Sequence, residues 1–376
     1  MKTKIILIIF ILGFVNINLT AEENNPKYDK NSLYNICLNT LVNGLYSNEK
    51  NVCIESIKLI GQLKDTSLIP HLKKLLANQD DDIRLETSFS LIKLGDKSSY
   101  NNLINILRSN PLDNQLSSSK PIERAKSLMK QNTRIRAAEM MGEIGEKIFI
   151  NVLLTIANNK YEYGPLIDKA RISLAKLGDR TKINSFIYAL HSDDKNIRAE
   201  ACKALGELKE KSVVNNLIEL LKYWDKNVRI QACSALAKIG DERAAESIST
   251  LLIDKDPEIR MVACEALGKL KSTKYIANLK ELLSKDENGF VRIAAAESLL
   301  NLNDNSGESL LLKTINSQDF DAKLKSIQIL GNYGTKNTLS ILEKNFYSEK
   351  NEILKLNISY AIIQITNRLR ASETKQ

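Results

Sequence analysis

The chain has 376 residues, and its 54 lysines and arginines outnumber 45 aspartates and glutamates to give a formal net charge of +9. Charges of both signs are interspersed along the chain, without the basic blocks of nucleic-acid-binding proteins, so this distribution predicts no nucleic-acid partner. Only two histidines are present, His71 and His191. Neither has another histidine or a cysteine at metal-ligand spacing, so the sequence predicts no metal site.

The first residues are typical of a signal peptide. Lys2 and Lys4 precede an apolar run over residues 5–15, and a short polar stretch then leads to Ala21. The run is shorter than the roughly 20 residues of a membrane-spanning helix, and no later stretch reaches that length. We expect cleavage after Ala21 (signal peptide 1–21, mature linker 22–31) and a periplasmic or secreted protein. Leu19 is large for its place near the cut, which leaves an uncleaved anchor as the alternative.

The rest of the chain is an internal repeat. The segment that begins at Asp225 recurs one period upstream at Asp194 and one period downstream at Asp256, with a period of 31 residues. One basic position defines the register in most units. It is occupied in chain order by Cys53, Arg84, Arg134, Ile167, Arg198, Arg229, Arg260, Arg292, Lys323 and Lys355. The single long step contains one period plus an insertion at about 109–127.

Each unit has the pattern of a helical hairpin. Apolar residues stand at −1, +3, +7 and +10 from the reference position and share one side of a helix. Asp194, Asp225 and Asp256 are placed to cap the start of this helix, and Pro257 fits its first position. Glycines are placed to end it, namely Gly95, Gly145, Gly178, Gly240 and Gly334. A second apolar stretch, as in residues 213–221 and 276–283, supplies the other helix.

A single hairpin cannot bury its apolar face, so the units must stack. The sequence therefore predicts an all-α solenoid over residues 32–366, elongated and curved, followed by a tail at 367–376. The insertion reads as a loop, and an extra helix could start within it at Pro121.

The pattern Asp-x-x-x-Arg, followed by alanine and by Ala-Leu-Gly spacing, resembles the HEAT repeat of the short, phycobilin-lyase-like type. This resemblance implies a right-handed, armadillo-like α-solenoid of about ten hairpins, with the arginine-bearing helices on the concave side. It also implies a structural ladder of ion pairs between the arginines and acids at the following turn. The arginines are Arg84, Arg134, Arg198, Arg229, Arg260 and Arg292, and the acids are Asp96, Asp179, Asp241 and Asp304. Cys53 and Lys355 depart from the pattern as capping units would, and Ile167 suggests a local bend.

One row of residues is a candidate partner-binding surface. The +1 positions are more apolar than a solvated helix face requires, and Ile230, Met261 and Ile293 form its centre. The alternative is that these side chains pack against the next helix of the stack. Trp224, the only tryptophan, lies in a hairpin loop and is either an exposed contact residue or part of the loop packing.

Nothing in the sequence resembles a catalytic constellation. Cys202, Cys233 and Cys264 occupy the same position in consecutive units, too far apart for disulfides, and we expect all five cysteines to be free thiols. No cofactor is implied. The sequence therefore predicts an exported, non-catalytic scaffold that binds a protein partner. An enzyme or chaperone-like factor similar to the phycobilin lyases is the second hypothesis, and a nucleic-acid-binding protein is the third.

Overall fold

The computed structural model describes residues 33–109 and 120–373. The predicted signal peptide and the whole predicted linker lie outside these ranges, as do residues 110–119 of the insertion. The described residues are helical and contain no strand, and their twenty α-helices pair into ten hairpins. The predicted all-α solenoid of about ten hairpins is confirmed.

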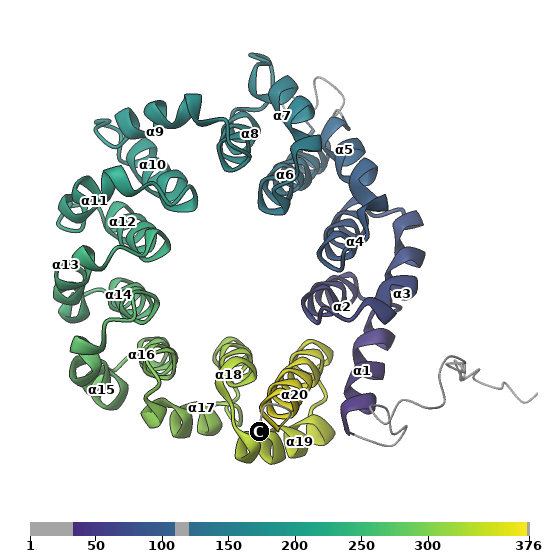
Figure 1. The fold of residues 1–376 in the computed structure, drawn as a ribbon, viewed down its shortest axis with the longest axis vertical. Coiled ribbons are helices and arrows are strands. Elements are labelled where there is room, and N and C mark those ends of the chain that lie inside the picture. The colour runs from purple at the N-terminus through teal and green to yellow at the C-terminus, as the bar shows by residue number, and fades with distance from the viewer. Residues whose placement is uncertain (1–32, 110–119, 374–376) are drawn as a thin grey trace, which may run out of the picture.

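Every hairpin consists of an outer helix and the inner helix that follows it (Figure 1). The outer helices are α1 (Leu33–Gly44), α3 (Ile69–Lys73), α5 (Tyr100–Arg108), α7 (Ile150–Ala157), α9 (Ile183–Ala189), α11 (Val214–Leu220), α13 (Ala245–Ser249), α15 (Ile276–Lys285), α17 (Glu308–Thr314) and α19 (Lys336–Ser348). The inner helices are α2 (Lys50–Gln62), α4 (Asp81–Lys93), α6 (Pro121–Ile144), α8 (Gly164–Lys176), α10 (Lys195–Glu207), α12 (Lys226–Ile239), α14 (Pro257–Lys269), α16 (Gly289–Asn301), α18 (Phe320–Tyr333) and α20 (Glu352–Glu373).

The inner helices form where the repeat predicts them. Asp194, Asp225 and Asp256 are the residues that cap α10, α12 and α14, and each accepts a hydrogen bond from a main-chain N–H of the first turn. In α12 the residues at −1, +3 and +7 are Val228, Ala232 and Leu236. None of the three is exposed, so the predicted face is the one that packs on the outer helix.

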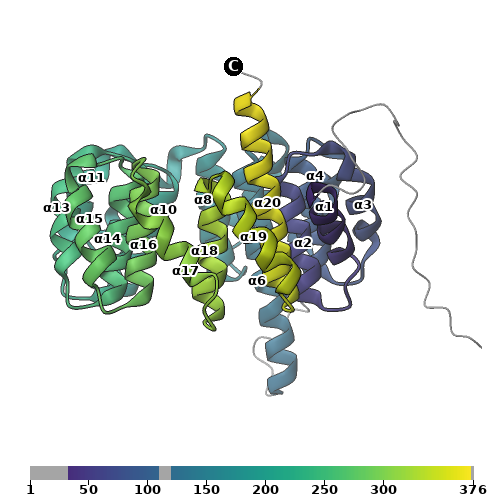
Figure 2. The ribbon, with the colours of Figure 1, turned by 90° about the horizontal axis from the view of Figure 1, so that it is seen from below.

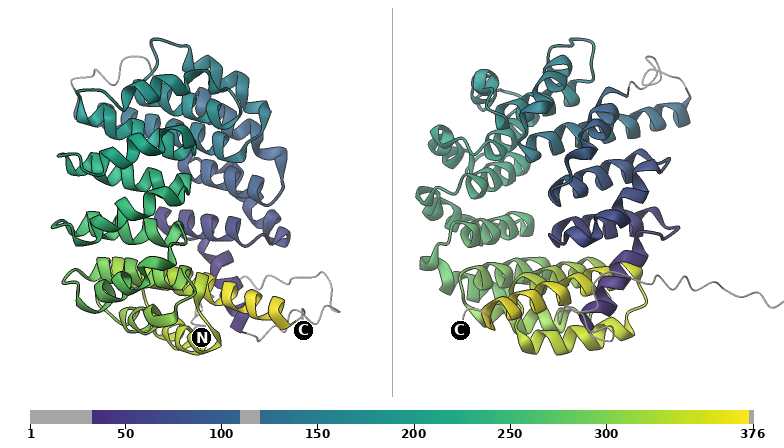
Figure 3. Two further views of the ribbon diagram at one scale, coloured as in Figure 1. Left: turned by 60° about the vertical axis from the view of Figure 1, so that its left-hand side comes forward. Right: turned by 45° about the vertical axis from the view of Figure 1, so that its right-hand side comes forward.

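The stack of hairpins closes into a ring (Figures 1 and 3). Helix α20 packs on α1 and α2, so the last hairpin lies directly against the first. One core cluster joins buried residues of α1 to α4, such as Leu41 and Ile60, with buried residues of α18 to α20, such as Ile327 and Ile362. Polar contacts cross the same seam: Asn357 Nδ2 donates to Glu55 Oε1 at 2.8 Å, and the Arg370 guanidinium lies 5.0 Å from the centre of the Tyr34 ring.

This closure differs from two expectations drawn from the sequence. The solenoid is a ring instead of an elongated open curve, and the units of Cys53 and Lys355 are not terminal caps. Both residues belong to inner helices that meet at the seam, where they have neighbours on both sides like every other unit. Each face that a free end would leave in water is covered by the other end of the chain.

Glycines explain why the inner layer can bend this tightly. Position +8 is glycine in several inner helices, and it meets a small residue at +6 of the next inner helix. A Cβ atom added to Gly206 would lie 2.6 Å from Ala235 Cα, and one added to Gly268 would lie 2.9 Å from Ser298 Cα. Consecutive inner helices pack directly on one another, with α8 and α10 as the exception, whereas outer helices pack mainly on their own inner partner. The hairpins are therefore wedges that are narrow toward the centre.

We expect Gly206→Ala to destabilise the protein by about 1–3 kcal/mol, because the added methyl group would push two backbones apart. Gly289 is the matched control, since the only atom within reach of an added Cβ there is a side-chain nitrogen of Arg292 at 3.7 Å. Gly289→Ala should leave stability unchanged or raise it slightly, by up to about 1 kcal/mol. Urea unfolding followed by circular dichroism measures both, and equal effects would contradict the close-approach explanation.

Three local features differ from the sequence expectation. The residues after Pro121 form no separate helix but extend α6 at its start, so that α6 projects from the ring (Figure 2). Helix α20 continues to Glu373 and includes most of the expected tail. Gly334 ends α18 with a φ of −61°, without the left-handed conformation that Gly95, Gly145, Gly178 and Gly240 adopt.

Candidate interaction site on the hairpin-turn rim

The ring has two different rims (Figure 2). On the hairpin-turn rim each outer helix turns into its inner helix, so all inner helices begin there. On the repeat-junction rim each inner helix ends and the chain passes to the next hairpin. The start of α6 projects from the first rim and the end of α20 projects from the second.

Exposed large apolar side chains gather on the hairpin-turn rim. Of those in the described part of the chain, all but Ile148 lie in a hairpin turn, at the helix ends beside it or in the projecting first part of α6. They are Tyr46, Ile122, Leu128, Met129, Tyr161, Tyr188, Ile197, Trp224, Ile253, Phe290, Phe320 and Tyr347. An accumulation of this kind on one edge of a protein is typical of an interaction surface.

Three of these side chains come from successive hairpins. Tyr188 is 78% exposed, Trp224 71% and Ile253 89%. The Lys195 ammonium lies 5.2 Å from the Trp224 ring centre, and the Arg198 guanidinium lies 4.4 Å from that of Tyr223. The cations of one hairpin thus hold the aromatic rings of the next in place, while the outer face of Trp224 stays open to solvent.

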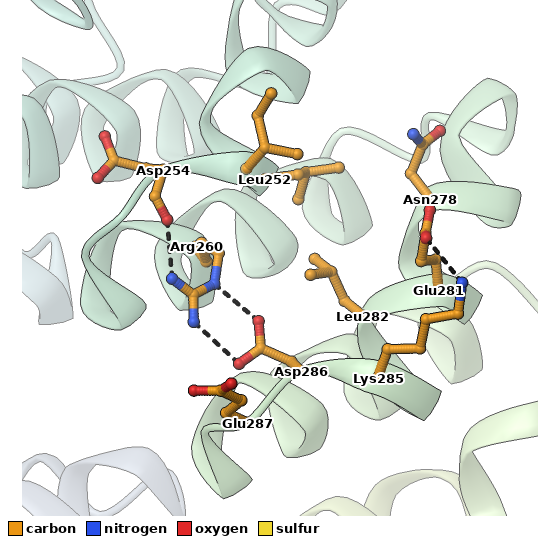
Figure 4. A pocket seen from close by; sticks show the side chains of 10 residues that line it. Leu252, Asp254, Arg260, Asn278, Glu281, Leu282, Lys285, Asp286 and Glu287 are labelled. Atoms are coloured by element: carbon orange, nitrogen blue, oxygen red, sulfur yellow. Dashed lines mark hydrogen bonds and ion pairs between the residues drawn. The ribbon is translucent and has the colours of Figure 1, made fainter.

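A cleft of about 390 Å³ adjoins this row, between the hairpins of α13/α14 and α15/α16 (Figure 4). Leu252 and Leu282 give it an apolar side, and Ile253 stands at its edge. Glu281 and Glu287 are exposed on its border. The cleft can accept an apolar group, and its border favours a positively charged neighbour.

Arg260 occupies the centre of the cleft wall. Its guanidinium donates to both carboxylate oxygens of Asp286, at 2.7 and 2.9 Å, and to the main-chain oxygen of Asp254 at 2.7 Å. The hydrogen bond from Arg260 lowers the pKa of Asp286, and the same bond raises the pKa of Arg260. Arg260 is thus paired with Asp286, and Lys285 of the lining lies 3.1 Å from Glu281, so Glu287 is the exposed acid that gives the border its negative charge.

The arginine series fixes the hairpin turns. Arg84, Arg198, Arg229, Arg260 and Arg292 each donate to the main-chain oxygen six residues earlier, at 2.5 to 2.9 Å. Some also reach an acid of the next hairpin, as Arg260 reaches Asp286 and Arg229 reaches Asp254 at 3.7 Å. The rim is therefore a set of rigid turns linked to one another.

The acids that the sequence paired with the arginines lie on the other rim. Asp96, Asp179, Asp241 and Asp304 each cap a 3₁₀ turn that precedes an outer helix. Asp96 and Asp304 also accept lysines of the preceding hairpin, Lys73 and Lys280, at 2.7 Å. The arginines mark the start of the inner helix and these acids follow its end, so the length of the helix separates them.

Arg134 is the buried member of the series. Its side chain is 2% exposed, pairs with both carboxylate oxygens of Glu162 at 2.8 and 2.7 Å, and donates to the Leu107 main-chain oxygen at 2.8 Å. Glu162 belongs to the turn before α8, where Ile167 stands at the arginine position. The turn before α8 has no arginine at the repeat position, and Arg134 of the preceding hairpin holds this turn instead.

The row predicted as a partner-binding groove lies on the inner helices. Ile293 is 3% exposed and packs within the core, while Ile230 and Met261 are half-buried against the neighbouring core cluster. Sequence reasoning missed the apolar rim. The sequence does place a large apolar residue in or beside successive hairpin turns. The prediction was based on positions within the helices, so it did not include the turns.

Charged residues of neighbouring inner helices pair around the ring. Lys169 lies 3.0 Å from Glu139 and 3.5 Å from Glu207, and Lys176 lies 3.4 Å from Glu207. Burial disfavours the charged form of Lys169, but Glu207 and Glu139 outweigh it and raise the lysine pKa. These pairs leave no surplus of one sign on this part of the inner layer.

The cysteines are buried free thiols, and burial raises the pKa of Cys202 and Cys233 to about 12. A thiol with so high a pKa is protonated at neutral pH and unreactive. Within residues 33–109 and 120–373, no cluster of three or more histidine, cysteine or acidic side chains is arranged to hold a metal ion. In the same ranges no helix combines the length and apolarity needed to cross a membrane.

Solved structures with a similar arrangement share little sequence with this chain. The complex of CpcE and CpcF of phycocyanin lyase from Nostoc sp. PCC7120 is 19% identical, with a TM-score of 0.35 over 68% of this chain and 95% of that one. Human deoxyhypusine hydroxylase is 15% identical, with a TM-score of 0.33 over 72% and 96%. Kap121p is 13% identical, with a TM-score of 0.35 over 94% and 44%. These likenesses assign no activity to this chain.

No curated protein sequence matches the chain. The family described as HEAT repeats matches residues 183–253 and 214–300, the stretch in which the 31-residue period is most regular.

Proposed function

We propose that this protein is an exported, non-catalytic scaffold that binds a protein partner on its hairpin-turn rim. The observation that carries the proposal is the concentration of exposed apolar side chains on that rim, centred on Tyr188, Trp224 and Ile253. Tryptophan and tyrosine supply a large share of the binding energy at protein interfaces.

The rigidity of the hairpin turns also favours the hairpin-turn rim as the binding surface. The arginines hold the turns through main-chain contacts, so a partner meets a surface that loses little conformational entropy on binding. The turns repeat around the ring, which suits a partner that contacts several hairpins at once.

The cleft defines the chemistry of the partner segment. Its apolar side at Leu252 and Leu282 accepts an aliphatic or aromatic side chain, and Glu287 favours a lysine or arginine beside it. We therefore propose a segment that presents an apolar anchor next to a basic residue.

The test is capture of the partner in the producing cell with a photo-crosslinking residue at position 188. Trp224→Ala combined with Ile253→Glu should reduce the captured partner at least tenfold, because both side chains are exposed and their loss leaves folding intact. Ile148→Glu is the matched control, since Ile148 is 54% exposed but lies on the opposite rim. Equal capture by all three proteins would overturn the proposal.

Protein purified from the same cells tests whether the chain is exported and cleaved. We expect the mature chain to begin at Glu22, as the pattern from Lys2 to Ala21 predicts. Mass spectrometry of the amino terminus checks this, and a protein that retains Met1 in the cytoplasm would contradict it.

A further inference from the structure

The repeat-junction rim carries an arc of exposed positive charge at the ends of α10, α12 and α14. We define this basic arc as Lys209, Lys211, Lys238, Arg243, Lys269, Lys271 and Lys274. All seven residues are exposed, and Arg243 among them pairs with Asp241 at 2.8 Å. They come from three successive repeat junctions on the part of the ring that lies away from the projecting end of α20 (Figures 1 and 2).

Three of the five acids of the same junctions are turned inward, whereas Glu242 and Glu246 are exposed. Glu210 and Asp241 have side chains only 12% and 18% exposed, because each caps a 3₁₀ turn through its carboxylate. Glu207 is 10% exposed and pairs with Lys169 and Lys176 of the preceding hairpin. The charge that these junctions expose to solvent is therefore more positive than the net charge of all their residues.

Backbone conformation gives an independent observation. Lys64, Lys209, Lys271 and Asn303 adopt positive φ values of 57°, 51°, 56° and 63° at the position where other repeats place Gly95, Gly145, Gly178 and Gly240. A side chain at this conformation is unfavourable relative to glycine, and strain that a fold retains points to a role for the side chain. Two of the three strained lysines belong to the basic arc.

We propose that the basic arc docks the ring on an anionic lipid surface. The ends of these inner helices lie next to one another on one rim, on the side of the ring away from the projecting end of α20, so an extended surface can contact all three (Figures 1 and 2). The exposed large apolar side chains lie almost entirely on the other rim, so the contact is electrostatic and peripheral. The hairpin-turn rim then faces away from the membrane, and this inference does not depend on the proposed protein partner.

The experiment is co-sedimentation of the purified mature protein with phosphatidylcholine vesicles containing 30% phosphatidylglycerol. Wild type should bind these vesicles, should not bind pure phosphatidylcholine, and should lose binding as salt rises to about 0.5 M. Lys209→Glu with Lys211→Glu and Lys274→Glu should weaken binding at least about 100-fold, since each lysine near the surface contributes about 1 kcal/mol. Lys222→Glu with Lys255→Glu, on the hairpin-turn rim, should leave binding unchanged.

A pair of glycine variants separates binding from folding. Lys209→Gly and Lys64→Gly both relieve a positive φ and should both raise the thermal midpoint. Only Lys209→Gly should weaken vesicle binding, by about fivefold, because Lys64 lies outside the arc. Equal vesicle binding by the two variants, or binding to duplex DNA but not to anionic vesicles, would overturn the proposal.

Discussion

Replacing Leu356 with aspartate is expected to open the ring without unfolding its hairpins. Leu356 is 2% exposed at the start of α20, and its Cδ2 would lie 2.9 Å from a Cβ atom added to Gly44 of α1. A carboxylate buried there without a partner would destabilise the closed ring by several kcal/mol. Separation of α20 from α1 and α2 returns the carboxylate to water while every hairpin keeps its own core.

Small-angle scattering and circular dichroism together test this expectation. Leu356→Asp should increase the radius of gyration and keep most of the helical signal. The matched control is Ile293→Asp, because Ile293 has the same register in α16 and is 3% exposed. There a buried carboxylate lies between hairpins that are consecutive in the chain, so the control should lose helical content at a lower temperature. An unchanged radius of gyration for folded Leu356→Asp would show that the ring stays closed despite the buried carboxylate, which would contradict this expectation.

The second large effect is expected for the buried ion pair of Arg134 and Glu162. Arg134→Met leaves Glu162 with a side chain 11% exposed and without its partner, so it should destabilise the protein by about 3–5 kcal/mol at pH 7. Arg84 has the same register and pairs with Asp81, but its side chain is 28% exposed. Arg84→Met should therefore destabilise the protein by about 1 kcal/mol or less.

The ion pair also predicts a pH dependence. The hydrogen bond from Arg134 lowers the pKa of Glu162, so the unfolded chain binds its proton at a higher pH than the folded chain does. The stability from this pair is complete above the ordinary glutamate pKa of about 4.3 and is lost as pH falls through the lower folded pKa. Urea unfolding between pH 7 and pH 3 should show a smaller acid-induced loss of stability for Arg134→Met than for wild type. Parallel losses would contradict this assignment.

Much of the fold could be predicted because it depends on local sequence. The aspartates that cap α10, α12 and α14 act on N–H groups two or three residues away, and the apolar period of α12 is set within one helix. Gly145 and Gly240, which follow α6 and α12, adopt the positive φ that the turn at the helix end requires, and this requirement involves that turn alone. Such signals are complete within one 31-residue unit, so reading the units in sequence recovers the hairpins.

The candidate site was harder to predict because it is assembled from several units. Tyr188, Trp224 and Ile253 occupy different positions in their repeats, and only the common rim brings them together. The partners of the arginines were missed for a related reason. Asp286 and Glu162 belong to the next hairpin, and the packing distance between hairpins decides that they come within reach.

The sequence by itself determined the helices, the ten hairpins and the face that each inner helix buries, because periodicity and capping act over a few residues. Only the tertiary structure decided that the solenoid closes into a ring. A small angle between one hairpin and the next is invisible in any one repeat, but summed over ten hairpins it brings α20 onto α1. Closure then separates the two rims, one apolar and one with a basic arc, on which the proposed functions rest.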